Sequence, residues 1–267
     1  MNEIESLMLG IIQGLTEFLP VSSSAHLVIT QTFLKLQPGQ LILFDLTVHM
    51  GTLCAVLIFF RQRIYSSLSA SVDLITGKNK TQNSFLLWYL MAATMATAIP
   101  GMLIKDTISE FFEQPHIIGL LLICNGALLL ATRLRKHYSI HSLDALTLRH
   151  AIIIGCFQVL GLFPGISRSG ITICAAVYLG IQASIAAEFS FLLAVFAILG
   201  AFSVEALQLH LNVRELFSPV YIVGFISAFI TGFAAIKLLF QIIRQKRFFY
   251  FGLYCIMLGI LIMFFIR

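Results

Sequence analysis

Two helix-breaking polar segments recur in this otherwise apolar chain, and they match each other position by position. The first covers residues 13–26 and contains Pro20, and the second covers 158–170 and contains Pro164-Gly165. Seven positions match at a constant offset of about 145 residues. The matched pairs are Gly10 with Gly155, Gln13 with Gln158, Leu15 with Leu160, Phe18 with Phe163, Val21 with Ile166, Ser22 with Ser167 and Ser24 with Ser169. Such a repeat points to a membrane-embedded site built from two half-helices.

The composition indicates a membrane protein. Hydrophobic residues make up 59% of the chain and charged residues only 11%, whereas a soluble domain carries about 25% charged residues. The net charge of +5 does not indicate nucleic-acid binding, because the basic residues lie in short loops between apolar runs. The five cysteines have no CxxC spacing and are expected to be free thiols.

Six apolar runs are long enough to cross a bilayer, which takes about 20 residues. They cover residues 41–60, 85–104, 117–132, 185–206, 220–240 and 248–266. Two further stretches, 6–34 and 151–181, are broken by Pro20 and by Pro164-Gly165. Because each half of a broken stretch is too short to span, both stretches are expected to enter and leave on one side of the membrane.

The loop charges predict the orientation. The loops within 61–84, 133–149 and 244–247 are basic and are expected on the cytoplasmic side, whereas the acidic loop at 105–113 and the neutral loop at 214–215 are expected outside. It follows that the first broken stretch opens outward and the second opens to the cytoplasm, with both termini outside.

The predicted fold is therefore a single all-α polytopic membrane domain over 1–267. It is an inverted repeat of about 1–132 and about 150–267, each half a re-entrant helix pair plus three transmembrane helices, with six spans and about ten helices in total. The two polar tips are expected to approach the midplane from opposite faces.

The second tip has the features of an anion site. Its helix restarts near Ser167, and the free N–H groups of a helix start attract anions. Arg168 can hold two phosphate oxygens in its planar fork, and Thr172 follows one turn later. The predicted phosphate-binding residues of both tips are Ser22, Ser24, Ser167, Arg168, Ser169, Gly170 and Thr172.

The first tip carries different side chains. Gln13 and Glu17 share one helix face, and Ser22 and His26 have the same spacing on the next half-helix. A carboxylate, hydroxyls and an imidazole beside a cationic anion site are the groups needed to attack a phosphorus atom. Glu17 is costly to bury and is read as functional.

These residues carry a family resemblance. Gln13-x-x-x-Glu17, the run Glu-Phe-Leu-Pro-Val-Ser-Ser-x-x-His over 17–26, and Pro-Gly-x-Ser-Arg-Ser-Gly-x-Thr over 164–172 resemble the two signature motifs of the undecaprenyl-pyrophosphate phosphatase family, also called bacitracin-resistance proteins. The similarity extends over nearly the whole chain and includes the segment 188–194.

The resemblance implies a multi-pass phosphatase of the bacterial inner membrane. It would hydrolyse undecaprenyl pyrophosphate to undecaprenyl phosphate and inorganic phosphate, recycle this lipid carrier for cell-wall synthesis and confer bacitracin resistance. It implies help from a divalent cation, Mg²⁺ or Ca²⁺, and a site that opens to the periplasm. In such a membrane the termini, which the loop charges place outside, are expected in the periplasm. The expected partners are the polyprenyl pyrophosphate lipid, the membrane and, as an open alternative, a second copy in a homodimer.

The resemblance also assigns roles. Ser23, Glu17, His26 and Arg168 are the predicted catalytic residues, with Ser23 as nucleophile and direct attack by water as the alternative. Glu17 is either a base or a metal ligand, with Gln13 as a second ligand. His26 either moves a proton or is a hydrogen-bonded core residue, and the other serines of the tips either bind phosphate or cap helices.

Several points remain open in the sequence. Many family members have Glu at the position of Gln13, and some have Pro at that of Phe196. A second function is a polyprenyl-phosphate transporter or flippase, since broken helices in inverted repeats also occur in transporters; flipping coupled to hydrolysis is a third. Asp45 and His49 are expected in supporting or surface positions, and Glu188 is expected to pair with Arg149 or to cap a helix.

Overall fold

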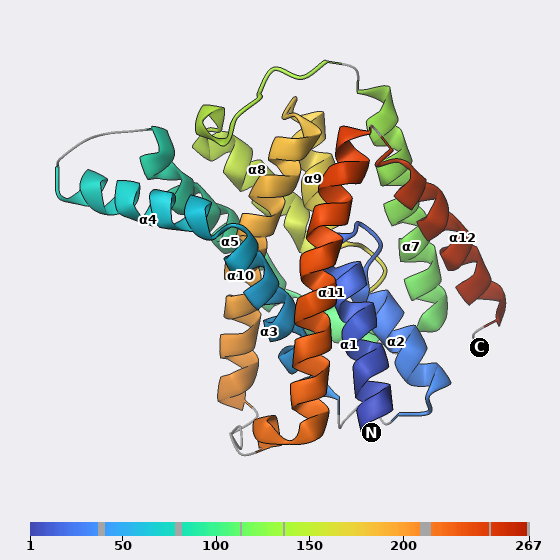
Figure 1. Cartoon of the computed structure of the whole chain (residues 1–267). Coiled ribbons are helices and arrows are strands. Elements are labelled where there is room, and N and C mark those ends of the chain that lie inside the picture. The colour runs from blue at the N-terminus through green and yellow to red at the C-terminus, as the bar shows by residue number, and fades with distance from the viewer. Residues whose placement is uncertain are drawn as a thin grey trace.

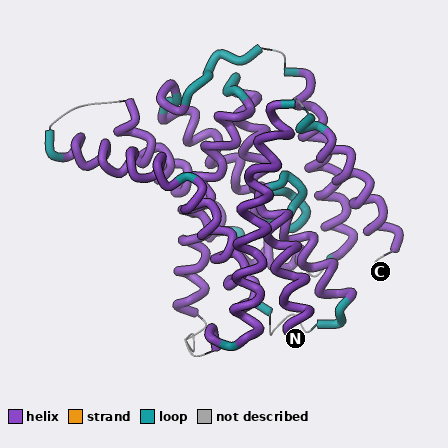
Figure 2. Tube along the Cα trace, in the orientation of Figure 1, coloured by secondary structure: helices purple, strands orange, loops and turns teal. Residues whose placement is uncertain are grey.

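The computed structural model describes residues 1–36, 41–77, 82–112, 114–135, 137–208, 215–245 and 247–265. The predicted loop charges Lys78, Lys80, Glu113, Lys136, Arg214 and Lys246, and the end of the last predicted span, lie outside these ranges. Within them the chain is almost entirely helical, and its one β contact is an isolated bridge between Ile140 and Ile181 (Figures 1 and 2). The all-α prediction is confirmed.

Among the described residues, five helices are long and apolar enough to cross a membrane by length and composition, so the chain is a multi-pass membrane protein. They are α3 (Ile42–Phe59), α5 (Leu86–Leu103), α7 (Pro115–Ala131), α10 (Ala183–Gln208) and α11 (Pro219–Arg244). The sixth predicted span corresponds to α12 (Tyr250–Phe265), which has 16 described residues and packs along α7.

Both broken stretches form helical hairpins with the predicted breaks. The first consists of α1 (Glu3–Phe18) and α2 (Ser23–Phe33), and the second of α8 (Leu148–Gln158), the short 3₁₀ turn η5 (Val159–Leu162) and α9 (Arg168–Tyr178). The longest of these helices, α1, has 16 residues, or about 24 Å at the helical rise, against a bilayer core of about 30 Å. None of the four helices is long enough to span.

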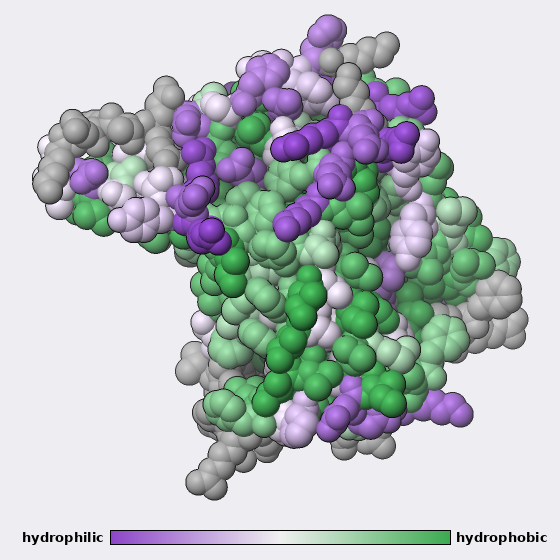
Figure 3. Space-filling model, in the orientation of Figure 1, coloured by the Kyte–Doolittle hydropathy of each residue, from purple (hydrophilic) through white to green (hydrophobic). Residues whose placement is uncertain are grey.

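The hairpins occupy opposite halves of the molecule, α1–α2 with the N-terminus in the lower half and α8–α9 in the upper half (Figure 1). The connecting loops meet in the middle of the bundle, where Figure 2 shows non-helical backbone surrounded by helices. The described parts of the three basic loops lie toward the upper end. On the face in Figure 3, hydrophilic side chains gather at both ends and an apolar zone lies between them.

Two further helices account for the difference from the expected ten. The region 61–84, predicted as a loop, contains α4 (Arg61–Ile75) and a short 3₁₀ turn, and α6 (Lys105–Phe112) follows α5 directly. The prediction of a plain loop at 61–75 was wrong, because Ile64, Leu68 and Val72 recur at helical spacing on a short amphipathic face. The repeat boundaries stay predictions.

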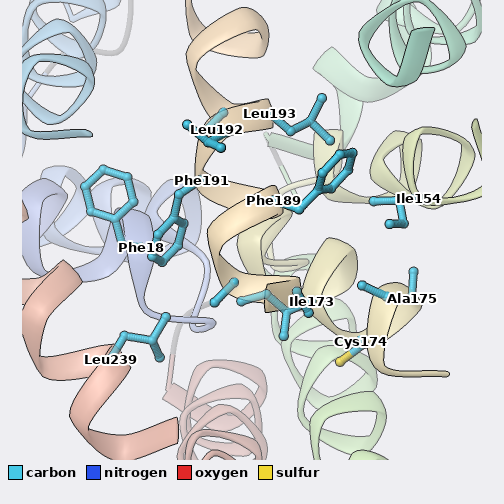
Figure 4. Packing of buried hydrophobic residues seen from close by; sticks show 14 of the residues in the cluster. Phe18, Ile154, Ile173, Cys174, Ala175, Phe189, Phe191, Leu192, Leu193 and Leu239 are labelled. Atoms are coloured by element: carbon cyan, nitrogen blue, oxygen red, sulfur yellow. The ribbon is translucent and has the colours of Figure 1, made fainter. Parts of the chain in front are cut away.

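The core places the first tip against α10. Phe18, the last residue of α1, is fully buried, and its ring meets Phe191 of α10 edge to face at a centroid distance of 5.2 Å (Figure 4). Phe60 and Phe240 pack around Phe191 in the same cluster. Edge-to-face packing of this kind fixes ring positions, so the residue immediately before the first tip is held in place.

Matched glycines bring each hairpin against a long helix. A Cβ atom at Gly10 would lie 2.5 Å from the carbonyl oxygen of Gly224 on α11, and one at Gly155 would lie 2.7 Å from the Cα atom of Ala93 on α5. Both contacts are too short for a side chain, so glycine permits the close backbone approach typical of membrane helix pairs. The repeated sequence position thus has a repeated packing role.

Candidate active site

The helix that follows the first tip begins with a strained serine. Ser22 is the N-cap of α2 and has φ 68° and ψ 92°, a region that costs a non-glycine residue about 1–3 kcal/mol. Its Oγ accepts from the N–H of Ala25 at 3.5 Å and from the N–H of Gly165 in the other hairpin at 3.1 Å. In this strained conformation the hydroxyl of Ser22 accepts one hydrogen bond from each hairpin.

The second tip uses the same capping device. Ser167 is the N-cap of α9, and its Oγ accepts from the N–H of Gly170 at 3.1 Å. The Oγ atoms of Ser167 and Ser169 are 3.0 Å apart, as those of Ser22 and Ser24 are 3.2 Å apart. The serine pairs that match in sequence also match in geometry.

Asn125 of α7 joins the two tips. Its side-chain Nδ2 donates to the carbonyl oxygen of Pro20 at 3.0 Å, and its Oδ1 accepts from the N–H of Ser167 at 3.1 Å. Asn125 is 1% exposed, so both hydrogen bonds are shielded from solvent. With the hydrogen bond from the N–H of Gly165 to Ser22, they hold the two tips together. The predicted meeting of the tips is present.

Glu17 is the centre of the site, and both hairpins contact its carboxylate. Arg168 from the second hairpin forms an ion pair with Oε1. On Oε2, the hydroxyl of Ser23 donates at 2.7 Å and the side-chain amide of Gln13 donates at 3.0 Å. The structure thus brings together four predicted residues, with Ser23 and Arg168 on opposite oxygens of one carboxylate.

The charges in this cluster are buried and paired. Glu17 is 7% exposed, and at such burial an unpaired carboxylate would be strongly destabilising. His49 of α3 adds an imidazole whose Nε2 lies 3.7 Å from Oε2 of Glu17. The supporting position expected for His49 therefore lies directly beside the cluster.

Two buried polar atoms of the cluster have no hydrogen-bond partner within the described parts of the chain. They are Nη1 of Arg168, a donor, and Oε1 of Gln13, an acceptor. Leaving a buried polar atom unpaired costs about 1–3 kcal/mol. An anion beside Arg168 would satisfy the first, and a cation or hydrogen-bond donor beside Gln13 would satisfy the second.

His26 lies at the same tip, and its two ring nitrogens have partners other than the hydroxyl of Ser23. Its Nδ1 is 2.7 Å from the carbonyl oxygen of Ser22, and its Nε2 is 2.7 Å from the hydroxyl of Tyr254 on α12. The hydroxyl of Ser23 donates to Glu17 instead. In this arrangement Glu17, not His26, is the group positioned to accept the serine proton.

The hydroxyl of Thr172 is engaged inside the protein. Its Oγ1 donates to the carbonyl oxygen of Arg168 at 2.9 Å and lies 2.6 Å from the hydroxyl of Ser190 on α10. Thr172 is 0% exposed. These contacts fix the first turn of α9, so Thr172 supports the backbone that carries Arg168.

Sequence reasoning missed Asn125 and Tyr254. Asn125 stands alone in an apolar span, and a polar side chain at membrane depth usually faces the bundle interior, so a signal existed. Tyr254 gave no such signal, because aromatic residues near span ends are common.

Glu188 pairs with Arg63 at 3.6 Å, so the pairing expected with Arg149 was wrong; α4 brings Arg63 into place. All five cysteines are free, as expected.

Comparisons with known proteins show the family of the chain. The family model described as bacitracin resistance protein BacA matches residues 6–261. The chain is similar to proteins named undecaprenyl-diphosphatase from Syntrophotalea carbinolica (40% identity over 263 residues, 97% of both chains) and from Desulfosudis oleivorans (38% over 268 residues, 97% of both). A relative of the same name from Methanobrevibacter smithii is 34% identical over 98% of this chain and 97% of its own.

Proposed function

This chain belongs to the bacitracin resistance protein BacA family, and from that membership we propose that it hydrolyses undecaprenyl diphosphate to undecaprenyl phosphate and inorganic phosphate. The reaction recycles the lipid carrier for cell-wall synthesis and confers bacitracin resistance. The observation that carries the proposal is the contact of Ser23 and Arg168, from two hairpins, with opposite oxygens of Glu17. A head group at this point meets a nucleophile, a base and a cation together.

The diphosphate binds first through Arg168. The unpartnered Nη1 donates to an oxygen of the terminal phosphate, and the planar guanidinium fork suits bidentate binding of such a group. The N-termini of α2 and α9 point toward the joined tips and add their partial positive charge. Binding therefore compensates a buried donor that the protein alone leaves unpaired.

Ser23 then attacks the terminal phosphorus. Its Oγ forms a bond to phosphorus while the proton passes to Oε2 of Glu17, 2.7 Å away, and the bond from phosphorus to the bridging oxygen breaks. Undecaprenyl phosphate leaves with the bridging oxygen and its electron pair. Arg168 stabilises the charge that develops on the equatorial oxygens.

Water completes the cycle. Glu17 first passes the serine proton to the departing undecaprenyl phosphate, so its carboxylate is again a base. A water molecule then attacks the phosphoserine, Glu17 accepts one of its protons, and Glu17 returns that proton to Ser23 Oγ as the bond from phosphorus to this oxygen breaks. Inorganic phosphate is released and the hydrogen bond from Ser23 to Glu17 is restored. Direct attack by water, with Glu17 as its base, is the competing route, and it forms no phosphoserine.

The divalent cation belongs to the same proposal. In the described residues no three His, Cys, Asp or Glu side chains cluster as a metal site, so the protein offers few ligands of its own. The unpartnered Oε1 of Gln13 beside Glu17 nevertheless fits a hard cation, and Mg²⁺ is often held by one or two carboxylates plus substrate phosphates. Glu17 and Gln13 would hold the ion, which would neutralise diphosphate charge.

The proposal includes a location. The first hairpin and both termini face the periplasm of the inner membrane, where the site opens, because the positive-inside rule puts the basic loops in the cytoplasm. The grouping of the described basic loops at one end of the bundle supports this orientation. The homodimer stays a prediction.

The test is phosphate release by the purified protein in detergent with undecaprenyl diphosphate, with and without Mg²⁺ or Ca²⁺. We expect turnover that Glu17→Gln lowers about 10²- to 10⁴-fold, the range for loss of a general base. Glu110→Gln in α6, at an exposed position, is the matched control. No phosphate release by the unsubstituted protein under any condition would refute the proposal, and head-group movement across sealed vesicles without cleavage would favour a transporter.

A further inference from the structure

The two ring nitrogens of His26 have different partners, and these set the tautomer. Nδ1 lies 2.7 Å from the carbonyl oxygen of Ser22, and a carbonyl oxygen only accepts, so Nδ1 carries the hydrogen. Nε2 of the neutral ring is then an acceptor. The hydroxyl of Tyr254, 2.7 Å away, donates to it. His26 is thus held from both edges, by its own hairpin and by the last helix of the chain.

The position of Tyr254 is tied to the joined tips. Its ring lies nearly parallel to that of His26, with an interplanar angle of 11° and centroids 5.7 Å apart. The next residue, Cys255, is fully buried, and its Sγ accepts from Nδ2 of Asn125 at 3.4 Å. Asn125 also binds the carbonyl oxygen of Pro20. The side chain that joins the hairpins therefore also anchors the turn of α12 that carries Tyr254.

A phenol hydroxyl suits this position because it both donates and accepts. It donates to Nε2 of a neutral imidazole and accepts from the same nitrogen when that nitrogen is protonated. The ring of His26 thus keeps one orientation in either protonation state. The partner of the second ring nitrogen is commonly what orients a functional histidine.

We propose that Tyr254 is a positioning residue that holds the tautomer and ring orientation of His26 for the phosphatase reaction. The inference rests on the proposed function and adds α12 to the elements that build the site. Nδ1–H of His26 donates to the carbonyl oxygen of Ser22, the residue before the nucleophile Ser23, so the imidazole holds the backbone that carries Ser23. Tyr254 contacts the site through His26, so its effect on turnover requires the imidazole.

The first test is kinetic. Tyr254→Phe keeps the aromatic ring and removes the hydroxyl, and we expect kcat to fall about tenfold with KM within about twofold of the unsubstituted value. Tyr250→Phe is the matched control, because Tyr250 lies one turn earlier on α12, is exposed, and packs on Phe249. Normal kcat in Tyr254→Phe would overturn the inference while leaving the phosphatase proposal intact. Absence of phosphate release by the unsubstituted protein would overturn both.

A double-mutant cycle separates positioning from simple packing. In a His26→Ala background, adding Tyr254→Phe should cause no further loss of kcat, because residues that act through one another are not additive. The same tenfold loss in both backgrounds would assign Tyr254 to helix packing and overturn the inference.

A chemical readout does not depend on turnover. Diethyl pyrocarbonate modifies an imidazole nitrogen that has a free lone pair, and in this structure Tyr254 occupies that lone pair of His26. Mass spectrometry of the peptide containing His26 should show faster modification in Tyr254→Phe than in the unsubstituted protein or in Tyr250→Phe. Equal modification rates in all three proteins would overturn the inference. This measurement needs no turnover, so it remains decisive if His26→Ala proves inactive and the double-mutant cycle gives no result.

Discussion

The two hairpins share one backbone design and carry opposite chemistry. In each, a serine caps the helix after the break and its hydroxyl lies close to that of the serine two positions later. In each, a glycine on the first helix packs against the backbone of a long helix. At the central matched position, however, the first hairpin has Ser23 and the second has Arg168.

The neighbouring matched positions diverge in the same way. Glu17 of the first hairpin corresponds to Leu162 of the second. Gln13 therefore donates to a carboxylate, whereas its counterpart Gln158 donates to the hydroxyl of Thr97 at 2.9 Å. Both glutamines keep a buried Oε1 without a partner among the described residues. The second hairpin retains the polar frame but lacks the acid.

This difference explains why neither hairpin makes a site alone. The first hairpin holds the nucleophile Ser23 and the carboxylate of Glu17 but no cation to pair with that carboxylate. The second hairpin holds the cation of Arg168 without an anion to pair with it. A buried charge is tolerated only when paired, so Glu17 and Arg168 stabilise each other across the interface. Their pairing also places the phosphate-binding group beside the nucleophile.

The largest expected effect comes from removing the nucleophile. Ser23→Ala should lower kcat by about 10³-fold or more, as loss of a nucleophile does in other hydrolases, while binding of undecaprenyl diphosphate persists. Ser109→Ala, an exposed serine of α6, should be neutral. Rapid-quench trapping of a phosphoenzyme would identify the serine route, and near-normal turnover in Ser23→Ala would favour direct attack by water.

Replacing the cation of the second hairpin should have the next largest effect. Arg168→Lys keeps the charge but loses the two-pronged grip, and we expect kcat/KM to fall about 10²- to 10³-fold. Arg149→Lys, exposed at the start of the same hairpin, serves as control. Similar kinetics in both variants would show that charge alone is needed and would refute bidentate binding.

Breaking the link between the hairpins should affect stability first. Asn125→Leu leaves the N–H of Ser167 without its partner, at about 1–3 kcal/mol for an unpaired buried group. It leaves the carbonyl oxygen of Pro20 with only the weak thiol donor of Cys255 at 3.6 Å. The melting temperature in detergent should fall. The activity, measured at a temperature where the variant is still folded, should also fall because the tips separate. Asn125→Asp keeps the acceptor for Ser167 and should lose less; equal stability of all three proteins would contradict the clamp.

The smallest effect tests whether the matched glycines do the same work. Gly10→Ala and Gly155→Ala should each destabilise by about 1–3 kcal/mol through overpacking against α11 and α5. Gly200→Ala in α10 meets open space and should be neutral or slightly stabilising. If only one of the two substitutions lowered the melting temperature, the claim that Gly10 and Gly155 have the same packing role would be contradicted.

Much of the fold followed from local physics. Apolar runs of about 20 residues predict spans, and the breaks at Pro20 and Pro164-Gly165 predicted the hairpin tips that the structure contains. The helix in 61–75 was missed because its apolar face is short and it lies between charged residues. For the site, the shared elbow was predicted, but the orientation of His26 was not, because it depends on Tyr254.

The amino-acid sequence by itself determined the class of the protein, the places where its helices break and the side chains that each break carries. These depend on composition, proline geometry and capping, which act over a few neighbouring residues. Only the tertiary structure decided that Glu17 accepts from Ser23, that Asn125 joins the tips and that Tyr254 holds His26. Those contacts bring together residues up to 228 positions apart, and packing of whole helices, not any local preference, sets which of them meet.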